Sequence, residues 1–120
     1  MNKKEYKRLI SYILKNDGAT LDAGGALVSM TAGYVVSVAG YNLKLKDIKN
    51  LKLKTLNKYL NIAKNNGLFF GVWYNRAGRY YDIDLNIITS DLKTAIIKAR
   101  ANKQRDIFDL KNINSIYINY

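Results

Sequence analysis

The stretch from Gly67 to Thr89 constrains the fold of this chain most, because it has the pattern of a β-hairpin. A polar gap, Asn75-Arg76-Ala77-Gly78, separates two strand-like runs, and its Asn and Gly supply the positive-φ positions that a short connection needs. The second run alternates: one face carries Tyr81, Ile83, Leu85 and Ile87, and the other carries Tyr80, Asp82, Asp84 and Asn86. This period of two predicts a half-buried antiparallel strand.

The first run of the hairpin is apolar on both faces, which predicts an interior strand with Trp73 in the core. Further strands are expected at 19–22, at 26–29 after a turn at Ala23-Gly24-Gly25, and at 34–38, a β-branched core strand. The uncharged span 23–43 is long enough, at about 20 residues, to cross a bilayer, but its glycines and alternation favour these strands. No Gly-Lys-Ser/Thr follows the glycine pair, so a turn is favoured over a phosphate loop.

Apolar residues spaced three and four apart predict three helices. The first begins with a capping box of Asn2 and Glu5, ends at Asp17-Gly18, and has the apolar stripe Tyr6, Leu9, Ile10, Ile13 and Leu14. The second ends at Gly67, with a break near Lys54-Thr55 left open, and has the stripe Ile48, Leu51, Leu56, Tyr59, Leu60 and Ala63. The third begins at a Ser90 cap and buries Leu92, Ala95, Ile96 and Ala99.

A second hairpin, 106–110 and 115–120 around a turn at Lys111-Asn112, closes the chain. With 120 residues, one modest core can form, so we expect a single domain over residues 1–120. The elements together predict an α+β fold, in which two or three helices pack on one face of an antiparallel sheet.

The absence of Cys and His limits the kinds of site that this chain can form. The chain has no Cys, which rules out disulfides and thiolate metal sites, and no His, the commonest acid/base group at neutral pH and the commonest zinc ligand. Together with the lack of a signal-peptide pattern, this indicates a cytoplasmic protein, with no cofactor and no metal predicted.

The positive charge points to a polyanionic partner. Twenty Lys and Arg stand against nine Asp and Glu, a formal net charge of +11. The lysines crowd into 44–64, where only Asp47 opposes them. The predicted partner-binding residues are Lys44, Lys46, Lys49, Lys52, Lys54, Lys58 and Lys64, joined by Lys4, Arg8 and Lys15 of the first helix and by Arg76 and Arg79 of the hairpin. The alternative is a compositional bias, because an AT-rich genome also enriches Lys, Asn, Ile and Tyr.

Two other constellations could carry function. Asp82 and Asp84 share a strand face and could hold Mg²⁺ if Asp106 or Asp109 supplied a third ligand, although an exposed strand has the same pattern. Tyrosines at positions where a strand could expose them would stack on single-stranded bases. They are Tyr34, Tyr74, Tyr80 and Tyr117.

The C-terminal half resembles small uncharacterised proteins of bacteriophages and other mobile elements. The matching residues are Gly71-Val72-Trp73-Tyr74, Tyr81-Asp82, Ala95, Ala99, Asn102-Lys103-Gln104, Ile107-Phe108-Asp109-Leu110 and Ile116, with a looser match at Tyr34 to Ser37. These motifs have a structural character: a tryptophan hairpin, an Asn-x-Gln helix end and an Asp-Leu turn. The resemblance implies a mobile-element origin and carries no catalytic residue with it.

We therefore expect a non-enzymatic phage or mobile-element protein that acts in the host-cell cytoplasm and has no membrane partner. It would bind nucleic acid or a nucleoprotein through its basic block, as an inhibitor of a host defence nuclease of the anti-CRISPR type. The alternative is a protein that binds single-stranded nucleic acid directly or assists replication. A metal-dependent nuclease is the weaker third hypothesis.

Overall fold

The computed structural model describes residues 1–29 and 31–120. In chain order its elements are α1 (Lys3–Asn16), β1 (Gly18–Leu21), β2 (Tyr34–Ser37), β3 (Leu43–Leu45), the short 3₁₀ helix η1 (Ile48–Asn50), α2 (Leu53–Asn66), β4 (Phe69–Asn75), β5 (Tyr80–Thr89), α3 (Leu92–Ala101), β6 (Asp106–Asp109) and β7 (Asn114–Tyr117). Within the described residues no helix is long and apolar enough to cross a membrane. The uncharged span 23–43 instead contains β2.

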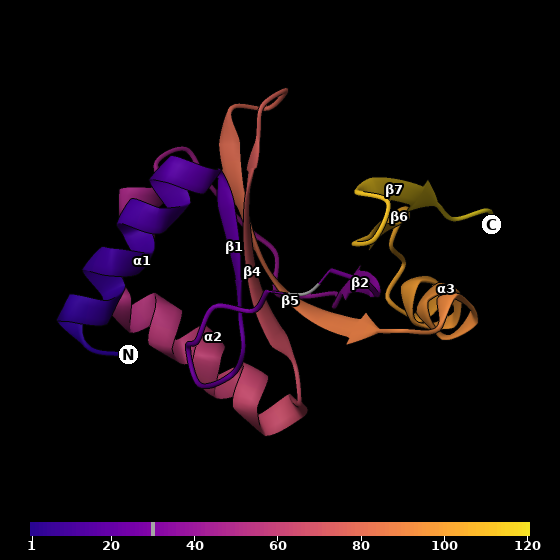
Figure 1. The fold of residues 1–120 in the computed structure, drawn as a ribbon, viewed down its shortest axis with the longest axis horizontal. Coiled ribbons are helices and arrows are strands. Elements are labelled where there is room, and N and C mark those ends of the chain that lie inside the picture. The colour runs from indigo at the N-terminus through magenta and orange to yellow at the C-terminus, as the bar shows by residue number, and fades with distance from the viewer. Residues whose placement is uncertain (30) are drawn as a thin grey trace.

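The strands form one antiparallel sheet in the order β1-β4-β5-β2-β6-β7 (Figure 1). The ten-residue strand β5 organises it. One edge of β5 pairs with β4 from Tyr80 to Asn86. The other edge is shared, because β3 pairs with its first half and β2 with its second half. The predicted hairpin and the interior position of its first strand are confirmed.

All three α-helices cover the same face of the sheet. Ile83 and Leu85 of β5 belong to a large core with residues of α1 and α2. Ile87, the next residue on that face, packs against a smaller core that contains Val36 and Ala95, beneath α3. The predicted α+β fold, with the helices on one face of an antiparallel sheet, is therefore confirmed, and no helix among the described residues lies on the opposite face.

The ends of the helices follow from local sequence. The capping box of α1 is present, since the Asn2 side chain accepts from the Glu5 N–H at 2.8 Å and the Glu5 carboxylate accepts from the Asn2 N–H at 3.1 Å. Both α1 and α2 end at a residue in the left-handed conformation, which is Asp17 for α1 and Gly67 for α2. Leu14 is half-exposed rather than buried, because it lies at the border of the α1 stripe.

Several local predictions are wrong. Residues 26–29 form no strand, and only one bridge, Leu21 to Leu27, joins them to β1. Ile48 and Leu51 are buried but precede α2, so they are not part of its stripe. Asp91 replaces Ser90 as the cap of α3, because its carboxylate reaches the Thr94 N–H.

The hairpin connection also differs from expectation. Arg79, rather than Asn75 or Gly78, takes the left-handed conformation, with φ of 58°. Asn75 instead accepts the Gly78 N–H on its side-chain oxygen at 2.9 Å, which fixes the connection without a positive φ at either residue.

Candidate functional site: a groove on the uncovered face of the sheet

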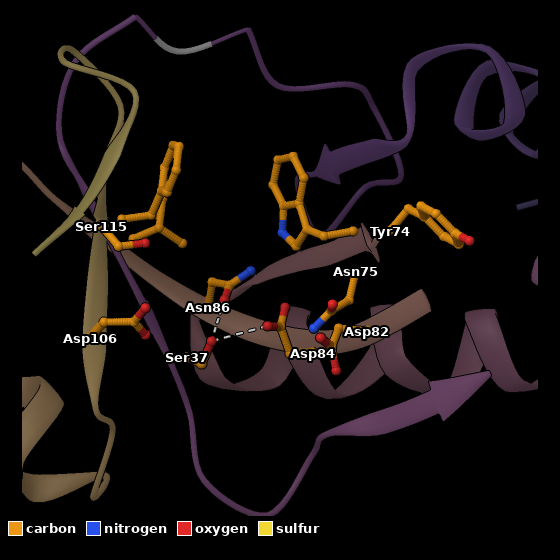
Figure 2. A pocket seen from close by; sticks show the side chains of 11 residues that line it. Ser37, Tyr74, Asn75, Asp82, Asp84, Asn86, Asp106 and Ser115 are labelled. Atoms are coloured by element: carbon orange, nitrogen blue, oxygen red, sulfur yellow. Dashed lines mark hydrogen bonds between the residues drawn. The ribbon is translucent and has the colours of Figure 1, made fainter. Parts of the chain in front are cut away.

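The uncovered face of the sheet is hollowed into an open groove of about 400 Å³. The sheet bends so that β6 and β7 stand across from β4, and the groove lies between these two walls, above β5 and β2 (Figures 1 and 2). Its lining comes from five strands: Val35, Ser37, Trp73, Tyr74, Asn75, Asp82, Asp84, Asn86, Asp106, Phe108 and Ser115. Of the described residues, three carboxylates and no Lys or Arg border it, although the chain carries a net charge of +11.

Trp73 belongs to this groove and not to the core, so its predicted placement is wrong. Its neighbours Val72 and Phe70 are fully buried beneath the helices, but Trp73 is 42% exposed. The reason is its position in the strand, because the alternation of β4 turns Trp73 to the face of Gly71 and Asp82. Phe108 of β6, which is 37% exposed, is a second aromatic residue of the lining.

The floor of the groove contains a buried polar cluster of Ser37, Asp84 and Asn86, whose hydrogen bonds are the dashed lines in Figure 2. The Ser37 hydroxyl lies 3.0 Å from Asp84 Oδ2 and 3.3 Å from Asn86 Oδ1, and it can donate to either. Asp84 is 9% exposed and Asn86 is 1% exposed. Burial raises the pKa of Asp84 to about 6; the hydrogen bond from the Ser37 hydroxyl and the nearby polar side chain of Asn86 oppose that rise, and the Asp82 carboxylate adds to it.

The other atoms of this cluster face Gly71. Asp84 Oδ1 and Asn86 Nδ2 are buried and have no hydrogen-bond partner among the described residues. Both atoms and Trp73 Nε1 lie within 3.2 Å of the place that a Cβ of residue 71 would take. Gly71 is paired directly opposite Asp84, and the absence of its side chain lets the Asp84 and Asn86 side chains pack closely against its backbone.

The three-carboxylate Mg²⁺ site that the weaker nuclease hypothesis requires is not found among the described residues. Asp82, Asp84 and Asp106 all line the groove, yet the described residues contain no group of three or more His, Cys, Asp or Glu suited to a metal ion. Asp109 is used elsewhere, because it accepts from the backbone of Lys111 and the side chain of Asn112 in the β6–β7 turn. Those bonds lower the pKa of Asp109. The third ligand that a metal nuclease would require is therefore not brought to Asp82 and Asp84.

The predicted basic residues lie mostly on the helical side of the molecule. Lys4, Arg8 and Lys15 follow one line along α1, as their spacing requires. Lys54, Lys58 and Lys64 lie on α2, with Lys49 in η1 and Lys52 between the two helices. All of these side chains are exposed. Hydrogen bonds from Asn57 to the Met1 backbone and from Tyr6 to the Leu51 backbone join the two helical segments.

The remaining predicted cations lie elsewhere. Lys44 is on β3, opposite Asp82, and its Nζ lies 4.9 Å from the centre of the Tyr80 ring. Lys46 follows β3 and is exposed. Arg76 and Arg79 are in the hairpin connection, where Arg76 pairs with Asp17 at 2.7 Å. The salt bridge therefore brings Arg76 close to the C-terminal end of α1, which Asp17 caps, while Lys44 lies on the sheet beside Tyr80.

The four tyrosines predicted to stack on bases differ in exposure and orientation. Tyr117 is 75% exposed, whereas Tyr34 and Tyr80 are half-buried. The ring of Tyr74 lies 4.9 Å from that of Tyr81 and points away from the groove (Figure 2).

The sequence analysis did not identify three residues of the groove floor: Ser37, Asn86 and Gly71. The signal that could have found them is polar and glycine residues inside strands that are otherwise apolar.

The motifs that carry the resemblance to mobile-element proteins have structural roles. Asn102 ends α3, donates to the Lys98 backbone at 2.9 Å, and accepts the Ala39 N–H at 3.1 Å. Asp109 holds the turn between β6 and β7, as described above. Comparison of the chain with protein-family models, curated proteins and solved structures gave no match in any of the three.

Proposed function

We propose that this protein binds nucleic acid, without catalysing a reaction on it, through a basic helical surface made of α1, η1 and α2. The observation that supports the proposal is the concentration of unopposed positive charge there. Residues 3–16 hold five cations and one acid, Glu5, and residues 48–66 hold five lysines and no acid. These two segments carry half of the twenty cations.

The cations of this surface are available to phosphates. All ten are exposed. In the described part of the chain the salt bridge between Arg76 and Asp17 is the one ion pair, and neither residue belongs to the surface. When such exposed, unpaired cations bind a nucleic-acid backbone, they release the counterions condensed on its phosphates. Binding should therefore be strong at low salt and weak at high salt.

A salt titration tests the proposal. We expect short fluorescent oligonucleotides to bind with an affinity that falls steeply from about 50 to 200 mM salt. In the variant with Lys49, Lys52, Lys54 and Lys58 all changed to Gln, the slope of log K against log salt should become shallower by about 3 for single strands. Thermal melting should change little, because these side chains are exposed.

A matched variant separates a defined surface from overall charge. Changing Lys93, Lys98, Lys103 and Arg105 to Gln removes the same charge from exposed positions in and after α3. We expect this variant to keep most of the affinity and slope. Equal weakening by both variants would show that only net charge matters, and no binding by the unmodified protein would refute the proposal.

The more specific hypothesis, inhibition of a host defence nuclease, stays a prediction. Capture of partners from host lysate with and without nuclease treatment tests it. A single protein partner that survives nuclease treatment would support the inhibitor hypothesis. Recovery of mixed nucleic acid that nuclease removes would support direct binding.

A further inference from the structure

A second hollow lies on the helical side of the molecule, between α1 and the loop that follows β1. Its volume is about 290 Å³. One wall is a flank of α1, whose lining residues are spaced as neighbours on one side of a helix: Glu5, Arg8, Leu9 and Tyr12. Leu21 of β1 and Leu27 of the loop complete the main lining, which is mostly apolar.

The hollow exposes apolar side chains from both of its walls. Tyr12 of α1 is 41% exposed and Leu27 of the loop is 51% exposed, while Leu9 and Leu21 are buried and close the floor. Neither Tyr12 nor Leu27 belongs to the two core clusters. A flat aromatic group in the hollow would therefore cover apolar surface that water otherwise contacts.

A row of cations borders this hollow. The row runs along α1 at intervals of four, four and three residues, which makes its members successive neighbours on the helix: Lys4, Arg8, Tyr12 and Lys15. All four are exposed. At about 1.5 Å per residue the row is roughly 16 Å long. Because Arg8 and Tyr12 belong both to the row and to the hollow, a ligand in the hollow lies directly beside positive charge.

An exposed aromatic ring within a row of cations is the arrangement that binds single-stranded nucleic acid, where bases stack on the ring and phosphates meet the cations. An anion without a flat ring would leave Tyr12 and Leu27 uncovered, and a neutral apolar molecule would not use the row. The one carboxylate among the described lining residues, Glu5, is engaged in the capping box of α1. A base inside a duplex stays stacked between its neighbours and does not reach such a hollow.

We propose that the hollow takes one unpaired base of a nucleic acid whose phosphates follow Lys4, Arg8 and Lys15, with Tyr12 as the stacking residue. This inference rests on the proposed function and narrows its ligand to a single strand. A volume of about 290 Å³ is at the lower end of known small-molecule sites, which fits one base. Stacking makes no distinction between bases, so little sequence preference is expected from this site.

Fluorescence anisotropy with three labelled probes separates stacking from charge. The probes are a short single strand, the same strand annealed to its complement, and a strand of equal length with abasic sites. Tyr12→Ala should weaken binding of the single strand about 5- to 100-fold and should not change the slope of log K against log salt, because it removes a ring and no charge. Binding of the duplex and of the abasic strand should change by less than about twofold.

Further variants show that the ring itself is responsible. Tyr12→Phe keeps the stacking surface and should bind as the unmodified protein does, and Leu27→Ser, on the opposite wall, should weaken single-strand binding severalfold. The matched control is Tyr117→Ala, which removes a 75% exposed tyrosine from β7 and should have no effect. Thermal melting confirms that the variants fold, as expected for exposed positions.

The outcomes distinguish this inference from the proposed function. Salt-dependent binding of the single strand that is unchanged in both Tyr12→Ala and Leu27→Ser would overturn the inference and leave the basic helical surface as a purely electrostatic site. Equal weakening of duplex and single strand by Tyr12→Ala would also overturn it. So would loss of binding to phosphatidylglycerol vesicles, but not to the single strand, in Tyr12→Ala, which would make the hollow a membrane contact. No binding of any oligonucleotide would refute both.

Discussion

Replacing Asp84 by Asn should make the protein more stable at neutral pH. The Asp84 carboxylate is buried, and its pKa rises from 3.8 to about 6 on folding. A difference of roughly two units corresponds to about 3 kcal/mol of destabilisation by the ionised form, at about 1.4 kcal/mol per unit. A buried amide carries its own smaller desolvation cost, so we expect a net gain of about 1 to 3 kcal/mol.

The gain should depend on pH in a defined direction. Between about pH 4 and 6 the folded protein holds the Asp84 proton more tightly than the unfolded chain does. Unfolding therefore releases protons, and the stability of the unmodified protein falls as the pH rises through this window. Above this window the penalty is complete, and below it the penalty vanishes. The Asn variant lacks this titration, so its advantage should be present at neutral pH and absent in acid.

Urea unfolding followed by circular dichroism, at neutral pH and near pH 4, measures this difference. A gain of 1 to 3 kcal/mol corresponds to a rise in melting temperature of roughly 4 to 15 °C for a chain of this size. Asp82→Asn, on the same face of β5 but partly exposed, is the control and should change stability by less than about 0.5 kcal/mol. An Asp84→Asn gain that is equal at both pH values, or a loss at neutral pH, would refute the reasoning.

Three further predictions concern the two faces of the sheet and the first helix. Gly71→Ala should cost about 1 to 3 kcal/mol in urea unfolding, since its Cβ would collide with Asp84 and Asn86; a neutral result would mean that these side chains move aside freely. Phe70→Ala should cost about 3 to 5 kcal/mol and Trp73→Ala less than about 1 kcal/mol in the same assay, because only Phe70 is in the core; similar costs would contradict the assignment of the faces. Asn2→Ala removes the cap of α1 and should lower stability by about 1 kcal/mol in thermal melting, whereas no change would show that α1 does not need its cap.

The parts of the fold that sequence predicted correctly are those set by local rules. The alternation of β5 identified both of its faces, because a strand with one buried face must repeat every two residues. The capping box at Asn2 and the glycine end of α2 also follow from the needs of unpaired backbone groups at helix ends. These features involve residues a few positions apart, so no knowledge of the tertiary structure is required.

The groove could not be predicted in this way, because it depends on which strands become neighbours. Ser37 meets Asn86 only because β2 pairs with the second half of β5, at a separation of 49 residues. Trp73 has apolar neighbours on both sides in sequence, and only the register with Asp82 shows that it faces the polar side. Asp84 looked like an ordinary exposed strand residue, and its burial depends on neighbours that are distant in sequence, such as Ser37 of β2 and Gly71 of β4.

The division of the interior into two clusters has a consequence for motion. The larger cluster joins α1 and α2 to the first part of the sheet, while the smaller one has four fully buried residues: Val36, Ala95, Ala99 and Ile107. A small cluster opens at a lower free energy than a large one, so α3, β6 and β7 should exchange their amide hydrogens sooner than β4. One wall of the groove belongs to each cluster. Opening of the smaller unit should therefore move one wall of the groove relative to the other.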